Sequence, residues 1–262
     1  MSDPIQFNDG AAYERYMGQW SRLVGHSFLD WLALAPNLRW LDVGCGNGAF
    51  TELLMERAAP STVCGIDPSA AQLAHARTRP ALKKAEFVPG DAMALPYPKD
   101  SFDAAVMPLV IFFVPEPAQG VAEMARVVAP GGAVTAYAWD IPGGGFPYQA
   151  LREEMKALGV EPPMAPNPEA SSLETMNTLW GRAGLEAVET KVISVRRTFA
   201  DFEDYWATVQ GGPNVSGRLK AMKPEERETL KARMRTVLPQ DAAGRITLTA
   251  RANAVKGRVR AR

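Results

Sequence analysis

The sequence predicts an α/β protein with a seven-stranded, mainly parallel sheet, an antiparallel last strand, helices on both faces and a helical cap insertion. Three observations predict this fold. Apolar strand patterns alternate with amphipathic helices through the first half of the chain, as in a parallel sheet covered on both faces. The first strand runs into a glycine-rich loop that opens a helix. About 45 residues separate the last two strand patterns, far more than a hairpin needs.

The first half of the chain is expected to supply five strands. A helix over residues 11–34 comes first, because Tyr16, Trp20 and Val24 follow one another at helical spacing. Short apolar runs that end at turn residues or glycines then predict strands at 39–44, 62–67, 85–88, 102–107 and 133–139, with helices at 49–59, 69–79 and 116–128 between them.

The second half is expected to be less regular. Ser69 and Ser171 each stand three residues before Gln or Glu, which is the capping-box pattern at a helix start. Pro224 is placed to begin a helix. We expect helices at 148–158 and 171–183, helical pieces within 201–238, and strands at 189–199 and 245–255.

The composition favours an ordinary globular protein. The 262 residues are 47% hydrophobic and 22% charged, and 29 basic side chains balance 29 acidic ones, so nothing draws the whole chain to nucleic acid or membrane. The two cysteines, Cys45 and Cys64, lack metal-ligand spacing, and no metal is expected. The sequence shows no secretion signal and no apolar run of about 18 residues, so we expect a cytoplasmic protein. The basic run 256–262 is most simply a solvated strand end.

The loop after the first strand, residues 41–50, carries three alternating glycines, Gly44, Gly46 and Gly48. Glycine permits positive φ and lets a ligand contact bare backbone, and the helix N-terminus behind the loop favours a negative ligand group. Asp67 ends the next strand, 19 residues past Gly48 (67 − 48 = 19). In nucleoside-binding units, an acidic residue about 20 residues after the glycine loop binds the ribose hydroxyls.

Asp42 decides between two kinds of nucleoside cofactor. It lies two residues before the first glycine, and the loop reads G-x-G-x-G rather than G-x-G-x-x-G. A carboxylate there would repel a pyrophosphate but attract the ammonium and sulfonium of S-adenosylmethionine. A third motif, Gly90-Asp91-Ala92, ends the third strand where it could bind the adenine edge. A nicotinamide-dependent dehydrogenase remains the weaker alternative.

Together, these motifs resemble those of class I S-adenosylmethionine-dependent methyltransferases with a type 11 methyltransferase domain. The resemblance is to the branch that contains quinone-biosynthesis and other small-molecule methyltransferases. The resemblance implies a Rossmann-like sheet. The stretches that carry it, in order, are Leu41-Asp-Val-Gly-Cys-Gly-Asn-Gly48, Gly65-Ile-Asp-Pro-Ser69, Gly90-Asp-Ala-Met-Ala-Leu-Pro96, Ser101-Phe-Asp-Ala-Ala-Val106 and Glu123-Met-Ala-Arg-Val-Val-Ala-Pro-Gly-Gly132. The lead-in Tyr13–Arg22 is similar to that branch as well.

The resemblance implies a role for each part of these motifs. The three glycines would pass under methionine and ribose, Asp42 would hold the ammonium, and Asp67 the ribose hydroxyls. Independently of the resemblance, the polar residues interleaved in the otherwise apolar N-terminal helix predict that it covers the methionine end through Tyr16 or Arg22, because Arg22 suits a carboxylate. The expected cofactor-binding residues are Tyr16, Arg22, Asp42, Gly44, Gly46, Gly48, Asp67, Pro68 beside adenine, Gly90, Asp91, Ala92 and Met93 at the adenine edge, and Met107 and Leu109 beside the sulfonium.

The chain departs from this family after the fourth strand, where many O-methyltransferases have a histidine. Residues 108–114 contain none, and both histidines, His26 and His75, fall on expected helices. No catalytic residue is therefore assigned, which is tolerable because alignment and desolvation can carry much of a methyl transfer. Aromatic residues that could line an acceptor pocket, about half of them simply core, are Tyr13, Tyr16, Trp20, Phe112, Phe113, Trp139, Phe146 and Trp206.

The sequence therefore predicts methyl transfer from S-adenosylmethionine to a small-molecule acceptor. An RNA or protein methyltransferase and a non-catalytic S-adenosylmethionine-binding regulatory protein remain alternatives, although nucleic acid is disfavoured as a partner. The acceptor, the methylated atom and the oligomeric state, monomer or homodimer, stay open. We expect one domain over 1–262, divided into an N-terminal cover (1–38), a cofactor-binding core (39–140), cap segments (141–185 and 200–240) and the last two strands (186–199 and 245–257).

Overall fold

Seven strands form one sheet in the order β3-β2-β1-β4-β5-β7-β6. The computed structural model describes residues 14–162, 164–212 and 215–261. The strands are β1 (Arg39–Val43), β2 (Thr62–Asp67), β3 (Glu86–Pro89), β4 (Phe102–Pro108), β5 (Val128–Trp139), β6 (Glu186–Phe199) and β7 (Ile246–Arg258). The pairs among β1 to β5 are parallel, and β7 runs antiparallel to both β5 and β6. The expected fold class is confirmed.

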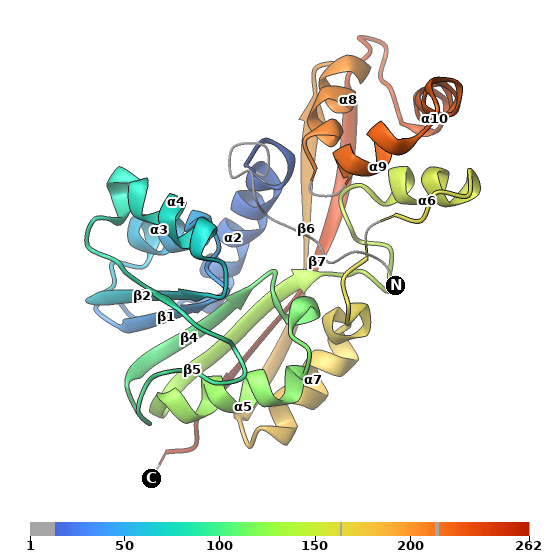
Figure 1. Cartoon of the computed structure of the whole chain (residues 1–262). Helices are drawn as coiled ribbons and strands as arrows, with labels where there is room; N and C mark the ends of the chain where they lie inside the picture. The colour runs from blue at the N-terminus through green and yellow to red at the C-terminus, as the bar shows by residue number, and fades with distance from the viewer. Residues whose placement is uncertain (1–13, 163, 213–214, 262) are drawn as a thin grey trace.

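Helices cover both faces of this sheet (Figure 1). One face carries α2, α3 and α4, and the other carries α5 and α7. The helices of the described residues are η1 (Glu14–Gly18), α2 (Gln19–Leu32), α3 (Ala49–Arg57), α4 (Ala70–Thr78), η2 (Pro80–Leu82), η3 (Ile111–Phe113), α5 (Pro117–Val127), α6 (Gln149–Ala157), η4 (Pro168–Ser171), α7 (Leu173–Arg182), α8 (Phe202–Gln210), α9 (Val215–Ala221) and α10 (Pro224–Val237).

Local signals placed most helix starts correctly, with one exception. Ser69 caps α4, with its hydroxyl accepting from Gln72 N at 3.4 Å, and Pro224 begins α10. The prediction that Ser171 caps α7 is wrong by one residue, because Ser172 accepts from Thr175 N at 3.1 Å. The chain first makes the turn η4, and the buried Ser171 hydroxyl donates to Pro168 O at 2.7 Å.

The N-terminal helix is part of the core. Trp20, Val24, Phe28 and Leu32 recur every four residues and are buried along one side of α2. Their ring contacts reach both halves of the chain: Phe28 packs 4.8 Å from Tyr137 on β5, between ring centroids. The expected helix over 11–34 is confirmed where the structure describes it, from residue 14 onward, and Tyr13 lies outside the described residues.

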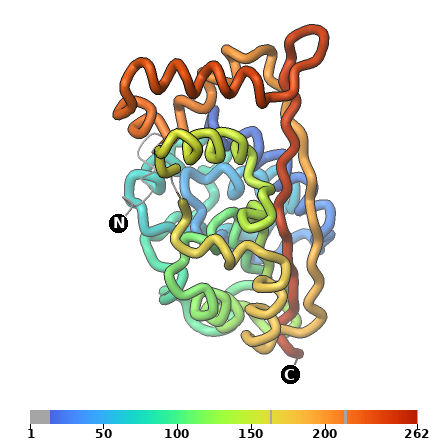
Figure 2. The backbone as a smooth tube through the Cα atoms, turned by 90° about the vertical axis from the view of Figure 1, so that its right-hand side faces the viewer, coloured from blue at the N-terminus to red at the C-terminus, as the bar shows by residue number. Residues whose placement is uncertain are grey.

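The last two strands extend beyond the rest of the sheet. Trp139, at the carboxyl end of β5, pairs with Ala252 of β7, yet the β6–β7 pairing continues to Phe199 and Ile246. Residues 246–251 therefore project past the carboxyl end of β5, and we call this projecting part of β6 and β7 the arm. Figure 2 shows the two strands side by side along the molecule, with α8, α9 and α10 at the end of the arm and α6 beneath α10.

The described residues contain neither a helix suited to cross a membrane nor a cluster of metal ligands. None of their helices combines the length and the apolar character that a membrane crossing requires. Within the same residues, no three His, Cys, Asp or Glu side chains gather in a way that could hold a metal ion.

Candidate functional site at the carboxyl ends of the strands

The glycine loop joins β1 to α3 at the carboxyl edge of the sheet. Gly44, Gly46 and Gly48 all have positive φ, at 74°, 52° and 79°, which glycine adopts without strain. Gly44 N and Cys45 N both donate to Ile66 O, at 2.7 and 3.0 Å, and so bind the loop to β2.

The three glycines differ in what surrounds them. A Cβ on Gly44 would lie 2.5 Å from Val110 Cγ2, and one on Gly48 would lie 2.6 Å from Leu82 Cδ1. A Cβ on Gly46 would meet no atom within 4 Å. Gly46 is therefore the loop residue whose backbone borders open space, where a ligand could lie against it.

Asp42 is a buried acid with one unused oxygen. It lies on β1 with no exposed surface, and Oδ2 accepts from Thr51 Oγ1 on α3 at 2.7 Å. Oδ1 has no hydrogen-bond partner within the described part of the chain. Burial raises the pKa of Asp42 to about 7, with Thr51 acting against the shift and Asp67 adding to it. A buried polar atom without a partner is costly, so Oδ1 is suited to a cationic or hydrogen-bond-donating ligand group.

Asp67, at the end of β2, ties two motifs together. Its Oδ2 accepts from Gly46 N at 3.0 Å, and its Oδ1 accepts from Ser69 N at 2.8 Å. Burial raises the pKa of Asp67 against the lowering effect of these two bonds. Each carboxylate oxygen has a second acceptor site, so ribose hydroxyls can still bind. Besides the ligand role expected for it, Asp67 therefore positions the glycine loop.

The third motif forms a tight turn beside Asp67. Gly90 N donates to Asp67 O at 3.2 Å, and a Cβ on Gly90 would lie 2.5 Å from Ile66 Cδ1. Asp91 is exposed, and its Oδ1 accepts from Met93 N at 2.8 Å. Ala92 and Met93 are half-buried in this turn. Pro68, which directly follows Asp67, is exposed. The structure thus brings the residues expected at adenine to one end of the sheet.

The two residues expected beside the sulfonium diverge. Met107 is fully buried, and its Cε lies 3.7 Å from where a Cβ of Gly120 on α5 would be. Its side chain therefore packs in the core against α5, and the expected contact of Met107 with the cofactor stays a prediction. Leu109 follows β4 with φ at 60°, and its N donates to Tyr137 O at 2.7 Å. A left-handed non-glycine residue is strained, as often occurs at binding sites.

The N-terminal helix meets the site through residues other than Arg22. Arg22 Nη2 pairs with Glu56 Oε2 at 3.1 Å on an exposed surface. Glu56 lies in the last turn of α3, whereas the glycine loop opens the first turn. The prediction that Arg22 reaches the methionine end is therefore wrong, because the helix carries it toward the far end of α3.

Arg79, which the sequence did not single out, contacts the glycine loop. Its Nε donates to Asn47 O at 2.7 Å, and its Nη1 and Nη2 bind Glu52 and Glu14 at 2.5 and 3.2 Å. Arg79 thereby joins the glycine loop to the start of η1. No motif marked it, since it is a lone arginine after a helix.

Tyr16 is 5% exposed and stacks on Tyr148, with ring centroids 4.4 Å apart. Tyr148 Oη donates to Tyr16 O at 2.6 Å and accepts from Trp20 Nε1 at 3.1 Å, and burial raises the pKa of Tyr148 to about 12. Tyr148 is a second residue that the sequence did not reveal. Of the expected pocket aromatics, Trp20 and Trp139 are core residues with at most 2% exposure.

Neither histidine lies at this edge of the sheet. His26 Nδ1 lies 2.7 Å from Arg57 Nη1 on the outer side of α2, and His75 is exposed on α4. The structure therefore assigns no histidine as a general base.

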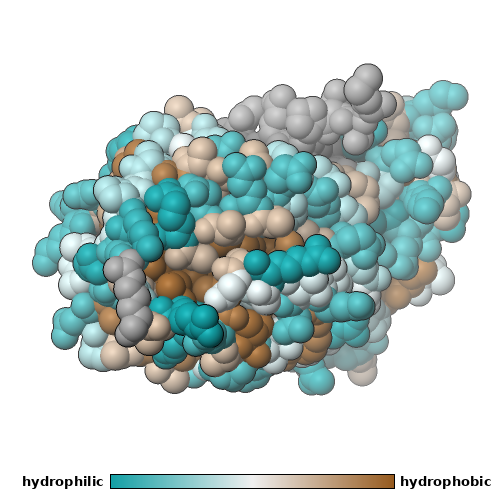
Figure 3. Space-filling model, turned by 90° about the horizontal axis from the view of Figure 1, so that it is seen from below, coloured by the Kyte–Doolittle hydropathy of each residue, from teal (hydrophilic) through white to brown (hydrophobic). Residues whose placement is uncertain are grey.

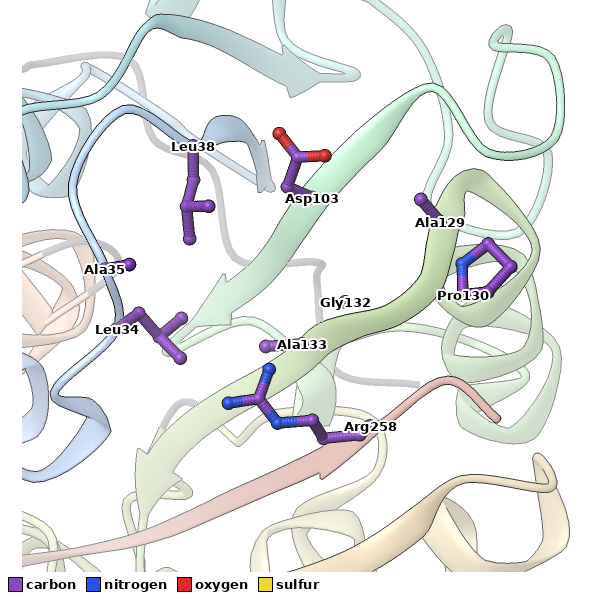
Figure 4. Close-up of a pocket in the computed structure, with 9 residues that line it drawn as sticks. All are labelled: Leu34, Ala35, Leu38, Asp103, Ala129, Pro130, Gly132, Ala133 and Arg258. Atoms are coloured by element: carbon purple, nitrogen blue, oxygen red, sulfur yellow. The ribbon is translucent and has the colours of Figure 1, made fainter. Parts of the chain in front are cut away.

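A separate cavity of about 240 Å³ lies at the opposite, amino-terminal edge of the strands (Figure 4). Its lining is largely apolar, with Asp103 and Arg258 at the sides. Figure 3 views the molecule from below and shows apolar surface bordered by hydrophilic side chains on that face. Asp103 is bound by Arg39, whose Nη2 lies 2.7 Å from Asp103 Oδ1. None of the expected cofactor-binding residues lines this cavity.

Comparison with known proteins supports the assignment of the core. The family of methyltransferase domains matches residues 41–136. A 2-methyl-6-phytyl-1,4-hydroquinone methyltransferase of Oryza sativa is 41% identical over 116 residues, which cover 44% of this chain and 33% of that protein. A demethylmenaquinone methyltransferase of Renibacterium salmoninarum is 36% identical over 148 residues, covering 54% and 58%. The chain thus spans about a third to three-fifths of these relatives.

The fold is shared more widely than the sequence. The structure of a phosphoethanolamine N-methyltransferase of Haemonchus contortus superimposes with a TM-score of 0.60 at 17% identity, over 96% of this chain and 57% of that one. The family match covers the stretch that runs from Asp42 to the fifth strand, which contains the glycine loop, Asp67 and the turn at Gly90. Residues 41–136 are therefore similar to the family of methyltransferase domains, and they lie within a sheet of the order β3-β2-β1-β4-β5-β7-β6.

Proposed function

We propose that this chain binds S-adenosylmethionine at the carboxyl ends of β1, β2 and β3 and transfers its methyl group to a small-molecule acceptor. The observation that carries the proposal is the buried Asp42 Oδ1, which has no partner among the described residues, beside a glycine loop that is open at Gly46. A positive, phosphate-free nucleoside satisfies both features. A pyrophosphate would place negative charge near Asp42.

The residues present fit S-adenosylmethionine without rearranging the motifs. Asp42 would face the ammonium, directly or through water, and Asp67 would accept from the ribose hydroxyls while it holds Gly46. The turn at 90–93 would border adenine. When bound, the cofactor supplies an electrophilic methyl group on its sulfonium. The chain's own part is to align the acceptor and exclude water, for which no general base is needed when the acceptor is already nucleophilic.

The arm and its helices are suited to cover the acceptor. They project from the carboxyl end of β5, the same edge at which ligands of open α/β sheets bind. Caps of this kind shield a reaction from water. The named relatives methylate quinones and hydroquinones, which supports a small organic acceptor rather than a macromolecule.

Calorimetry with three ligands tests the cofactor. We expect S-adenosylmethionine and S-adenosylhomocysteine to bind with dissociation constants of about 1–100 μM, or about 5–8 kcal/mol. NAD should show no measurable binding, because its pyrophosphate meets Asp42. Tighter binding of NAD than of S-adenosylhomocysteine would contradict the proposal.

Two alanine substitutions in the loop should separate folding from binding. Gly46→Ala should cost about 1–2 kcal/mol of stability for its left-handed backbone but abolish most S-adenosylhomocysteine binding, because its methyl enters the open space. Gly44→Ala should cost more, about 2–4 kcal/mol, since its Cβ would also collide with Val110. Thermal unfolding and calorimetry measure the two effects. Normal cofactor binding by Gly46→Ala would place the ligand elsewhere.

A further inference from the structure

An arginine interrupts the apolar inner face of the arm. Along β6, Ile193, Val195 and Phe199 are buried, and Arg197 occupies the same side of the strand half-buried. Its guanidinium carbon lies 4.4 Å from the Phe199 ring centroid. A charged side chain in a buried apolar row usually has an ionic partner. Arg197 has no carboxylate partner within the residues that the structure describes.

The contacts of Arg197 leave donors unused. Its Nη1 donates to the carbonyl oxygens of Arg15 and Tyr16, at 3.2 and 3.4 Å, and to Tyr148 Oη at 3.4 Å. A guanidinium has five N–H donors in a planar fork, and all three recorded contacts use Nη1. The Nε and Nη2 groups are therefore available to a bidentate anion.

Arg152 on α6 is a second cation of the same kind. It is half-buried, and its guanidinium carbon lies 5.1 Å from the Phe146 ring centroid. Its recorded hydrogen bond goes to Met164 Sδ, a weak acceptor. Burial lowers the pKa of Arg152, while Tyr16 acts in the opposite direction. Glu154, two residues further along α6, pairs with Arg233 instead.

Other cations of the cap region contrast with these two arginines. Lys231 and Arg235 on α10 both pair with Glu203, at 3.0 and 2.5 Å. The region can therefore supply carboxylates to its basic residues. Within the described residues, neither Arg152 nor Arg197 forms an ion pair with a carboxylate.

Both arginines border one group of rings, which we call the Tyr148 cluster: Tyr16, Phe146, Tyr148, Phe199 and Tyr205. Tyr148 lies 6.1 Å from Phe146 and 6.2 Å from Tyr205, between centroids. Arg197 contacts the Tyr148 hydroxyl and the Phe199 ring, and Arg152 lies over Phe146. The fully buried Tyr205 hydroxyl has no partner among the described residues. Of these rings, Phe146 is half-buried, whereas Tyr16, Tyr148, Phe199 and Tyr205 are at most 5% exposed. Unused donors therefore meet one accessible ring, Phe146, beneath the cap.

We propose that the acceptor is an anionic ring compound, whose carboxylate or phosphate group is bound by Arg152 and Arg197 while its ring packs on Phe146 at the edge of the Tyr148 cluster. This inference rests on the proposed function, because it places the acceptor under the cap beside the cofactor site. Partial burial strengthens such ion pairs relative to those on the surface. A neutral quinol would leave both guanidinium groups without an anion.

The test measures ligand binding rather than turnover. Calorimetric titrations use the full chain, with and without saturating S-adenosylhomocysteine, and three probes of similar size: 4-hydroxybenzoate, phenyl phosphate and the neutral 4-hydroxybenzamide. At least one anion should bind about tenfold or more tightly than the amide. The better anion identifies the acidic group as carboxylate or phosphate. Equal binding of anions and amide, or no binding of either anion at about 1 mM, would overturn the inference.

Substitutions locate the anion. Arg152→Gln and Arg197→Gln should each weaken anion binding about tenfold and leave the affinities for S-adenosylhomocysteine and the amide unchanged. Arg152→Lys and Arg197→Lys should partly restore anion binding, which a purely structural role would not produce. Arg182→Gln, at an exposed position on α7, is the matched control. Unchanged anion binding in both Gln variants would contradict the anion site. If the wild-type chain does not bind S-adenosylhomocysteine at all, the proposed function is contradicted instead.

Discussion

Asp67→Ala is expected to weaken S-adenosylhomocysteine binding about a hundredfold or more. The variant would lose the two charge-assisted hydrogen bonds proposed between Asp67 and the ribose, each of about 1.5–3 kcal/mol. It also loses the acceptor that holds Gly46 N at 3.0 Å, so the glycine loop is less well ordered for the ligand. Isothermal titration calorimetry measures the change.

The apo-protein should respond to Asp67→Ala as well. Gly46 N and Ser69 N both lose their acceptor, so unfolding free energy should fall by about 1–3 kcal/mol. Ser69→Ala is the matched control, because it removes the α4 cap at Gln72 and leaves Asp67 in place. The control should lose stability without a hundredfold loss of affinity. An unchanged dissociation constant in Asp67→Ala would show that Asp67 serves the loop and helix start alone.

The affinity for S-adenosylhomocysteine is expected to rise about tenfold between pH 6 and pH 8. Burial raises the pKa of Asp42 to about 7, so the Asp42 carboxyl of the free protein is mostly protonated at pH 6. An ammonium ligand requires the carboxylate, and each binding event below pH 7 must release its proton. Calorimetry in buffers of different ionisation enthalpy detects this proton. Asp42→Asn should bind weakly at every pH, and a pH-independent affinity in the wild type would contradict the ammonium contact.

The same carboxyl makes the free protein less stable as the pH rises. A raised acid pKa means that the folded chain binds more protons than the unfolded one between about pH 4 and 7, so its stabilising contribution is lost as the pH rises through 7. The shift corresponds to about 4 kcal/mol. Asp42→Asn should flatten this slope in denaturant unfolding between pH 5 and 8.

Asp103→Asn is the control for that slope. Its hydrogen bonds from Arg39 hold the pKa of Asp103 below its ordinary value. Its stabilising contribution is therefore present above the unfolded pKa and is lost only as the pH falls through the lower, folded value. This variant should leave the slope between pH 5 and 8 unchanged. A slope unaffected by Asp42→Asn would show that the Asp42 carboxyl ionises normally in the fold.

Much of the cofactor site follows from local sequence. The loop at 44–48 and the acids at 42 and 67 lie within one strand–loop–helix–strand unit, where alternation and glycine spacing fix the geometry over short range. The strands therefore appear where their apolar runs predict them. The Ser171 error shows the reach of such signals, since a turn at η4 shifts the helix start by one residue.

The direction in which a side chain points could not be predicted from local sequence in the same way. Arg22 and Arg79 are both arginines on or after helices, yet Arg79 meets the loop and Arg22 pairs with Glu56. Met107 is the last residue of the expected strand, and only the packing of α5 shows that its side chain contacts that helix. These outcomes depend on the rotation and crossing of helices, which no single segment encodes.

By itself, then, the sequence determined the sheet, the motif loops and the class of cofactor, because each depends on backbone propensity and spacing within about 30 residues. Only the tertiary structure decided which cations lack a carboxylate. Arg152 and Arg197 lie 45 residues apart (197 − 152 = 45) and meet one ring cluster through Tyr148 and Phe146. That juxtaposition arises because β6 extends past β5 and α6 folds back beneath α10, and long-range packing of this kind leaves no periodic mark in the sequence.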